Sequence, residues 1–122
     1  MILVDTSIWI DHLHTGDPVM DRLLREDTVV LHPFVLGEIA LGNLKDRKRV
    51  LAELDTIPAA GMVANEDVLE LIHQQELAGS GIGLIDAHLI ASTLLVGDDL
   101  LWTRDRRLAA VAHRLGIDAT SD

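Results

Sequence analysis

Cysteine is absent from the 122 residues, and aromatic side chains are few. Without cysteine the chain can form neither disulfides nor zinc sites with thiolate ligands. The only aromatic residues apart from histidine are Trp9, Phe34 and Trp102. Proteins that hold single-stranded nucleic acid by stacking present several exposed rings, so a stacking platform is disfavoured. We expect both tryptophans to lie in the core rather than in a ligand site.

Long apolar runs are also missing, although 48% of the residues are hydrophobic. A transmembrane helix needs about 20 consecutive apolar residues, and no run approaches that length. The chain opens directly on a short apolar segment, without the basic leader of a signal peptide. We therefore expect a cytoplasmic protein without a membrane segment. Its length predicts one domain over residues 1–122.

Basic residues are scarce: ten Lys and Arg stand against twenty Asp and Glu, for a formal net charge of −10. Binding to nucleic acid normally depends on a basic surface, so this charge argues against a polyanionic substrate. Two local clusters run against the trend; they are Lys45, Arg47, Lys48 and Arg49, and Arg104, Arg106 and Arg107. Either cluster could contact phosphate. Equally, they could be solvated helix faces, with Lys48 and Arg49 paired to Glu53 and Asp46.

Histidines are dispersed rather than grouped, and we expect them at the surface. The six are His12, His14, His32, His73, His88 and His113. A glycine-rich segment, 79–83, precedes Leu84 but lacks the glycine spacing and the lysine of a phosphate-cradling loop. We interpret it as a hinge or tight connection.

Short apolar segments alternate with longer stretches of helical periodicity. The expected strands span 2–4, 28–31, 61–63, 100–102 and 117–119; the expected helices span 7–14, 18–26, 33–43, 46–54, 66–78, 84–96 and 105–115. This alternation predicts an α/β fold with three layers, in which a central, mostly parallel β-sheet is flanked by helices.

Four carboxylates occupy positions where polar residues are least expected. Asp5 directly follows the first strand, and Asp105 follows the strand at 100–102. Ligand sites of parallel sheets collect beyond the carboxyl ends of the strands, where both residues would lie. Glu38 and Asp86 fall inside expected helices, each on the side that carries the apolar residues. These placements suggest that the four side chains converge.

Three of these acids also have an ordinary structural explanation. Asp5 and Asp105 could cap helix N-termini, and Asp86 could favour a first helical turn. Glu38 has no such role, because an unpaired charge on an apolar helix face costs stability. The joint pattern therefore favours a shared site over independent caps.

A shared site has an electrostatic consequence. Two like charges about 4 Å apart repel by roughly 4 kcal/mol at an effective dielectric constant near 20. A whole domain is stable by only about 5–15 kcal/mol. The cluster must therefore hold protons, stay open to water or bind a cation. Ligands that are all oxygen suit a hard ion such as Mg²⁺ or Mn²⁺.

The four acids and their neighbours, in their order along the chain, resemble a PIN domain and more narrowly a VapC-type toxin ribonuclease. The matching residues are Asp5, Thr6, Ser7 and Trp9; Glu38 and Gly42; Asp86, Ala87, Ile90 and Ala91; and Thr103 and Asp105. The set extends over essentially the whole chain. One departure is Leu108, where members of the family often have an aromatic residue a few positions after the last acid.

The resemblance implies an endoribonuclease that depends on Mg²⁺ or Mn²⁺ and leaves a 5′-phosphate. Asp5 and Asp86 would be the principal metal ligands, with Glu38 and Asp105 completing the set directly or through water. Thr6, Ser7 and Thr103 would hydrogen-bond the carboxylates, although turn and cap hydroxyls have an equally good structural explanation.

The resemblance also implies partners: an RNA substrate, a small cognate antitoxin protein and a second copy of the chain in a homodimer. Two alternatives stay open. A receiver-like phosphoacceptor domain has a similar size and clustered acids, but it needs an acidic pair after the first strand and a late lysine, and here the lysines are Lys45 and Lys48. A catalytically inactive PIN-like module would bind a partner without cutting RNA.

Overall fold

The computed structural model describes residues 1–119 and confirms the alternation of strands and helices. Its strands are β1 (Ile2–Val4), β2 (Val29–Val30) and β3 (Leu100–Trp102). Its helices are α1 (Thr6–Thr15), α2 (Pro18–Arg25), α3 (Pro33–Leu41), α4 (Arg47–Leu54), α5 (Asn65–Gln74), α6 (Leu84–Leu95) and α7 (Arg106–Arg114). The expected helices are all present, most with ends shifted by one to four residues.

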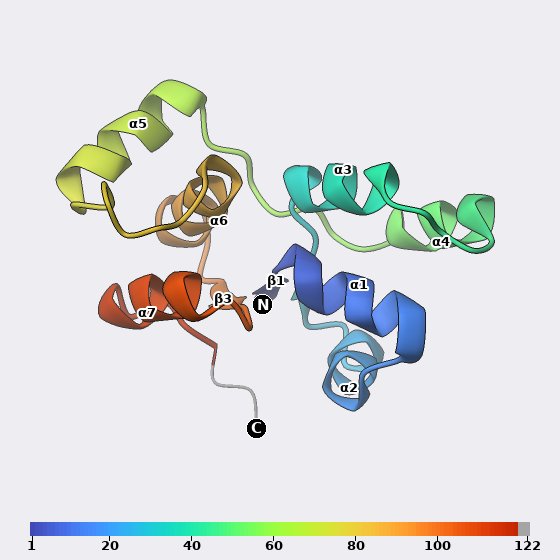
Figure 1. Cartoon of the computed structure of the whole chain (residues 1–122). Helices are drawn as coiled ribbons and strands as arrows, with labels where there is room; N and C mark the ends of the chain where they lie inside the picture. Colours follow the sequence, from blue (N-terminus) through green and yellow to red (C-terminus); the bar gives the residue numbers. More distant parts are fainter. Residues whose placement is uncertain (120–122) are drawn as a thin grey trace.

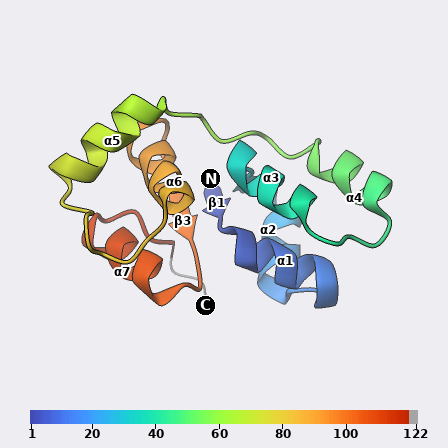
Figure 2. The ribbon, with the colours of Figure 1, turned by 45° about the horizontal axis from the view of Figure 1, so that its top comes forward.

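The sheet is parallel, and its strand order is β2-β1-β3. The apolar β1 is central, and its residues Leu3 and Val4 are fully buried. Figure 1 shows the helices arranged around these strands. In Figure 2, helices α1 to α4 gather on one side and α5 to α7 on the other, with β1 and β3 between them. The predicted α/β class with a flanked parallel sheet is thus confirmed.

One continuous core joins the sheet to the helices around it. Helix α6 lies at its centre, since its residues from Ala87 to Thr93 are all buried. Trp9 and Trp102 are 2% and 3% exposed, which confirms that they are core residues. Fully burying an aliphatic side chain such as Leu3 or Val4 contributes roughly 1.5–3 kcal/mol, so the core stabilises the sheet. No helix within residues 1–119 is both long enough and apolar enough to cross a membrane.

The expected strand at 61–63 is wrong. The chain instead makes a single parallel bridge two residues earlier, between Leu31 and Ala59. The amide of Leu31 donates to the carbonyl of Pro58 at 2.8 Å, and the amide of Ala60 donates to the carbonyl of Leu31 at 3.0 Å. Pairing stops there because Pro33 begins α3 two residues after Leu31, so β2 offers no further extended backbone.

The expected edge strand at 117–119 is also reduced to a single bridge, in which Asp118 pairs with Leu101 of β3. The amide of Leu101 donates to Ile117, and the amide of Ala119 donates back to Leu101. This segment lies beside β3 and runs parallel to it, as expected of an edge strand. Only one residue pair of the ladder forms within residues 1–119.

Two histidines contradict the expectation of a surface position: His32 is fully buried and His88 is 4% exposed. Phe34 lies between them, with ring centroids 5.2 Å from His32 and 4.8 Å from His88. The Nδ1 atom of His32 accepts a hydrogen bond of 2.9 Å from the amide of Phe34, which caps α3. Burial lowers the pKa of His32 to about 4, with a further contribution from His88, and burial also lowers the pKa of His88. Both rings are therefore neutral at pH 7.

Candidate active site

The ends of β1 and β3 lie side by side and fix the position of Asp5. The parallel register pairs Val4 with Trp102, so that Asp5 and Thr103 follow at the same edge of the sheet. The hydroxyl of Thr103 donates to Asp5 Oδ2 at 2.7 Å, and the amide of Thr6 donates to Asp5 Oδ1 at 2.8 Å. Asp5 is only 9% exposed. Each carboxylate oxygen therefore has one hydrogen bond that holds its orientation.

Asp105 is connected to Asp5 through the same threonine. Its amide donates to the hydroxyl oxygen of Thr103 at 3.0 Å, while that hydroxyl donates to Asp5. The Oδ1 atom of Asp105 caps α7 by accepting from the amides of Arg107 and Leu108, each at 3.0 Å. Leu108 itself is fully buried, so the position at which the chain departs from the family pattern serves the core.

Asp86 is the third residue of α6 and is partly buried. Its Oδ2 atom accepts a hydrogen bond of 3.0 Å from the amide of Gly83. Burial raises the pKa of Asp86, and the negative charges of Asp5 and Asp105 raise it further, while the Gly83 amide acts in the opposite direction. This electrostatic coupling links three acids from three separate segments of the chain.

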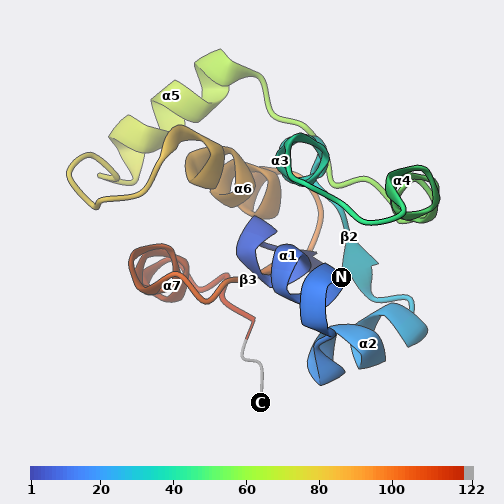
Figure 3. The same cartoon turned by 45° about the vertical axis from the view of Figure 1, so that its right-hand side comes forward.

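Glu38 faces the same space from α3, which packs against α1. Together with Asp5, Asp86 and Asp105 it lines one cavity of about 570 Å³, here called the acidic cavity. Thr6, Ser7 and Ile10 of α1 and residues 83–85 complete its walls. In Figure 3, the start of α1 is seen between α6 and α7, which places the ends of these helices around one region.

Arginine does not neutralise these carboxylates. Arg104 directly precedes Asp105 in the sequence, but its guanidinium group pairs with other carboxylates. It donates a hydrogen bond to Asp17 and lies 3.6 Å from Asp11. Its guanidinium also lies over the ring of Trp102. Among residues 1–119, none of the ion pairs includes Asp5, Glu38, Asp86 or Asp105. The four carboxyl groups therefore line the cavity without a paired cation in the described part of the chain.

The capping roles and the shared cavity coexist. Asp5 caps α1, Asp105 caps α7, and Asp86 forms the return bond of a capping box at α6. Capping occupies Oδ1 of Asp105 and Oδ2 of Asp86, and in the described part of the chain the other oxygen of each accepts no hydrogen bond from protein. Nevertheless, no three His, Asp or Glu side chains within residues 1–119 lie close enough together to hold a metal ion as they stand.

The three expected supporting residues differ in what they contribute. Thr103 bonds to Asp5 through its hydroxyl, whereas Thr6 does so through its backbone amide. Ser7 is exposed at the wall of the cavity. Sequence reasoning missed the amide of Gly83 as a partner of Asp86; the signal for it is the spacing of three residues between an N-cap and an acid.

Comparison with known proteins assigns the family. A family model described as "PIN domain" matches residues 2–114. The chain belongs to the PIN domain family. It is 44% identical over 117 residues to proteins named Ribonuclease VapC32 from Mycobacterium tuberculosis strains CDC 1551 / Oshkosh and ATCC 25618 / H37Rv, across 96% of this chain and 94% of each relative. The resemblance drawn from the ordered residues is confirmed, and the receiver-like alternative is excluded.

Proposed function

We propose that this PIN-domain protein is a metal-dependent endoribonuclease and the toxin of a toxin–antitoxin pair. It would hydrolyse phosphodiester bonds in RNA and leave a 5′-phosphate. The observation that carries the proposal is the acidic cavity, which is lined by carboxylates from four separate segments that form no ion pair within residues 1–119. The two relatives, which are named ribonucleases, support the choice of RNA.

The donor set fits Mg²⁺ or Mn²⁺, because carboxylate oxygens are the ligands that these hard ions prefer. Asp5 and Asp86 would be the principal ligands, with Glu38 and Asp105 completing the set directly or through water. Because no three of these acids are gathered closely enough to hold a metal ion, binding would require side-chain rotation. When bound, such an ion lowers the pKa of a coordinated water and neutralises charge on the phosphoryl oxygens.

The chain's own residues would position the reacting groups. Thr103 and the Thr6 amide fix the orientation of Asp5, so little side-chain freedom remains to be lost on binding. The pKa of Asp86 is raised by burial and by its acidic neighbours, and a nearby positive charge would favour its ionised form. Water would add to phosphorus as the 3′-oxygen leaves.

The proposal includes partners and setting. A small cognate antitoxin would block the acidic cavity, a second copy of the chain would form a homodimer, and an RNA substrate implies a cytoplasmic location. We also propose that residues 1–122 form one domain, since one core joins the described elements and the family match extends over 2–114. An inactive PIN-like binding module is the remaining alternative, and activity distinguishes it.

The direct test is cleavage of RNA by purified protein that is free of antitoxin. We expect cleavage with Mg²⁺ or Mn²⁺, 5′-phosphate at the new ends, loss of activity in chelator and recovery when metal is restored. Product ends are identified by susceptibility to a 5′-phosphate-dependent exonuclease. Cleavage that persists in chelator would contradict the metal requirement, and no cleavage of any RNA would favour the inactive module.

A further inference from the structure

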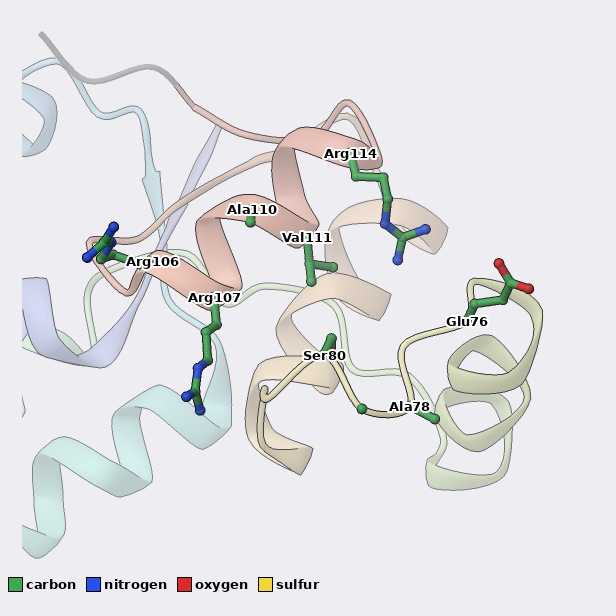
Figure 4. Close-up of a pocket in the computed structure, with 9 residues that line it drawn as sticks. Glu76, Ala78, Ser80, Arg106, Arg107, Ala110, Val111 and Arg114 are labelled. Atoms are coloured by element: carbon green, nitrogen blue, oxygen red, sulfur yellow. The ribbon is translucent and has the colours of Figure 1, made fainter.

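A second cavity lies along α7 and is rich in arginine. It has a volume of about 720 Å³, within the range of roughly 300–1,000 Å³ that is typical of ligand sites, and we call it the arginine cavity. Its walls are Arg106, Arg107, Ala110, Val111 and Arg114 of α7 and Glu76, Ala78, Gly79 and Ser80 of the connection from α5 to α6. In Figure 4, Arg107 extends from the start of α7 and Arg114 from its end, whereas Arg106, next to Arg107, points away from Ser80 and Ala78 of the connection.

These arginines keep their charge available. Elsewhere Arg22, Arg25, Arg49 and Arg104 each pair with a carboxylate. By contrast, no carboxylate within residues 1–119 pairs with the three arginines of the arginine cavity, although Glu76 lies at its wall. Arg114 donates to the backbone carbonyl of Gln75 at 2.9 Å, which orders the side chain but leaves its charge uncompensated.

The arginine cavity adjoins the acidic cavity across the first turn of α7. The amide of Arg107 donates to Asp105, which lines the acidic cavity, while the side chain of Arg107 lines the other. That side chain also lies against Gly81, so closely that a Cβ there would be 2.6 Å from Arg107 Cδ. Gly83, two residues on, lines the acidic cavity. The two cavities therefore both border the start of α7 and the glycine-rich segment 79–83.

We propose that the arginine cavity binds phosphate groups of the RNA strand that flank the cleaved bond. This inference rests on the proposed ribonuclease function and adds a site for its substrate. Guanidinium groups bind phosphate through two parallel hydrogen bonds. They are therefore suited to binding the sugar-phosphate backbone of RNA without stacking on its bases. A chain with a net charge of −10 and three non-histidine aromatic residues needs such a local positive site to hold a polyanion.

The test measures RNA affinity separately from cleavage. A fluorescein-labelled single-stranded RNA is titrated with protein in chelator over a range of salt concentrations, and binding is followed by fluorescence anisotropy. We expect Arg107→Gln with Arg114→Gln to raise Kd about tenfold. Because each phosphate contact to a single strand contributes about 0.7 to the slope of log K against log salt, the slope should fall by about 1.4.

Matched variants separate a phosphate site from general charge. Arg22→Gln with Arg25→Gln makes the same charge change on the exposed face of α2, where these arginines pair with Glu26 and Asp21, and should leave the slope unchanged. Arg114→Lys retains the charge and should retain most of the slope, which controls for loss of the Gln75 contact. Poly-glutamate serves as an anion without phosphate, and its weaker binding should not depend on Arg107.

The outcomes are distinct. Equal slopes for wild type and the Arg107, Arg114 double variant, or equal losses in the Arg22, Arg25 double variant, would overturn the site. Equal loss of affinity for poly-glutamate would reduce it to a surface for acidic chains and would also overturn it. A wild type that binds RNA through these arginines but never cleaves it would refute the ribonuclease while leaving the phosphate site intact.

Discussion

Replacing Asp86 with asparagine should reduce RNA cleavage by about 10³-fold while leaving the metal-free protein at least as stable as wild type. Removing a charged metal ligand costs several kcal/mol of transition-state stabilisation, and about 4 kcal/mol corresponds to that factor. Stability should not fall, because burial and the charges of Asp5 and Asp105 raise the pKa of Asp86 and so disfavour its ionised form in the native state. Asparagine also retains an acceptor for the Gly83 amide.

Single-turnover cleavage and thermal unfolding, measured on the same preparations, check both parts of this prediction. Asp5→Asn should lose activity to a similar extent. Asp98→Asn is the matched control, since Asp98 is exposed in the connection between α6 and β3 and lies outside the acidic cavity. Full activity in the Asp5 and Asp86 variants would refute the assignment. Unfolding of the Asp86 variant would instead show that the charge of Asp86 stabilises the native state.

Acid should destabilise the protein through His32, by up to about 3 kcal/mol between pH 6.5 and pH 4. The pKa of buried His32 is about 4 in the native state, against 6.5 for an unperturbed histidine. The unfolded chain therefore binds the proton first as pH falls, and stability drops across that window; above pH 6.5 the full contribution is present. Protonation would also break the cap that Nδ1 provides for α3. His88, whose pKa is also lowered by burial, acts in the same direction.

The variant His32→Asn isolates this effect. Asparagine is a good N-cap but does not titrate, so the variant should be less stable at pH 7, because volume is lost, yet should lose less stability on acidification. His73→Asn, at an exposed position of α5, is the control. Urea unfolding at a series of pH values gives the free energies. Parallel pH profiles for wild type and His32→Asn would show that His32 does not set the acid sensitivity.

Much of the fold was predictable because its signals are local. The apolar triplets of β1 and β3 are followed by Asp5 and Asp105, which mark the points where these strands end and helices begin. The parallel sheet then brings the carboxyl ends of the two strands together. Pro33 marks the start of α3. The strand expected at 61–63 failed because pairing depends on what β2 can offer, and nothing in residues 61–63 themselves reveals that Pro33 ends that strand early.

The placement of the four acids around one cavity was predictable, but their individual contacts were less so. The position of Glu38 on an apolar helix face was the decisive sign, since capping could not explain it. The burial of His32 and His88 around Phe34 depends on the packing of α3 against α6, which periodicity does not specify. Arg106 and Arg107 stood out as a basic cluster, but Arg114 did not, because its membership of the arginine cavity depends on the connection from α5 to α6.

Direct counting of bound Mn²⁺ tests the central claim, that four separate acids create one cation site. Electron paramagnetic resonance of free Mn²⁺ during titration with protein measures occupancy without requiring activity. We predict at least one ion bound per chain in the wild type and at least tenfold weaker binding in Asp86→Asn, with Asp98→Asn unchanged. A wild type that leaves all Mn²⁺ free, or an Asp86 variant that binds it equally well, would contradict the account.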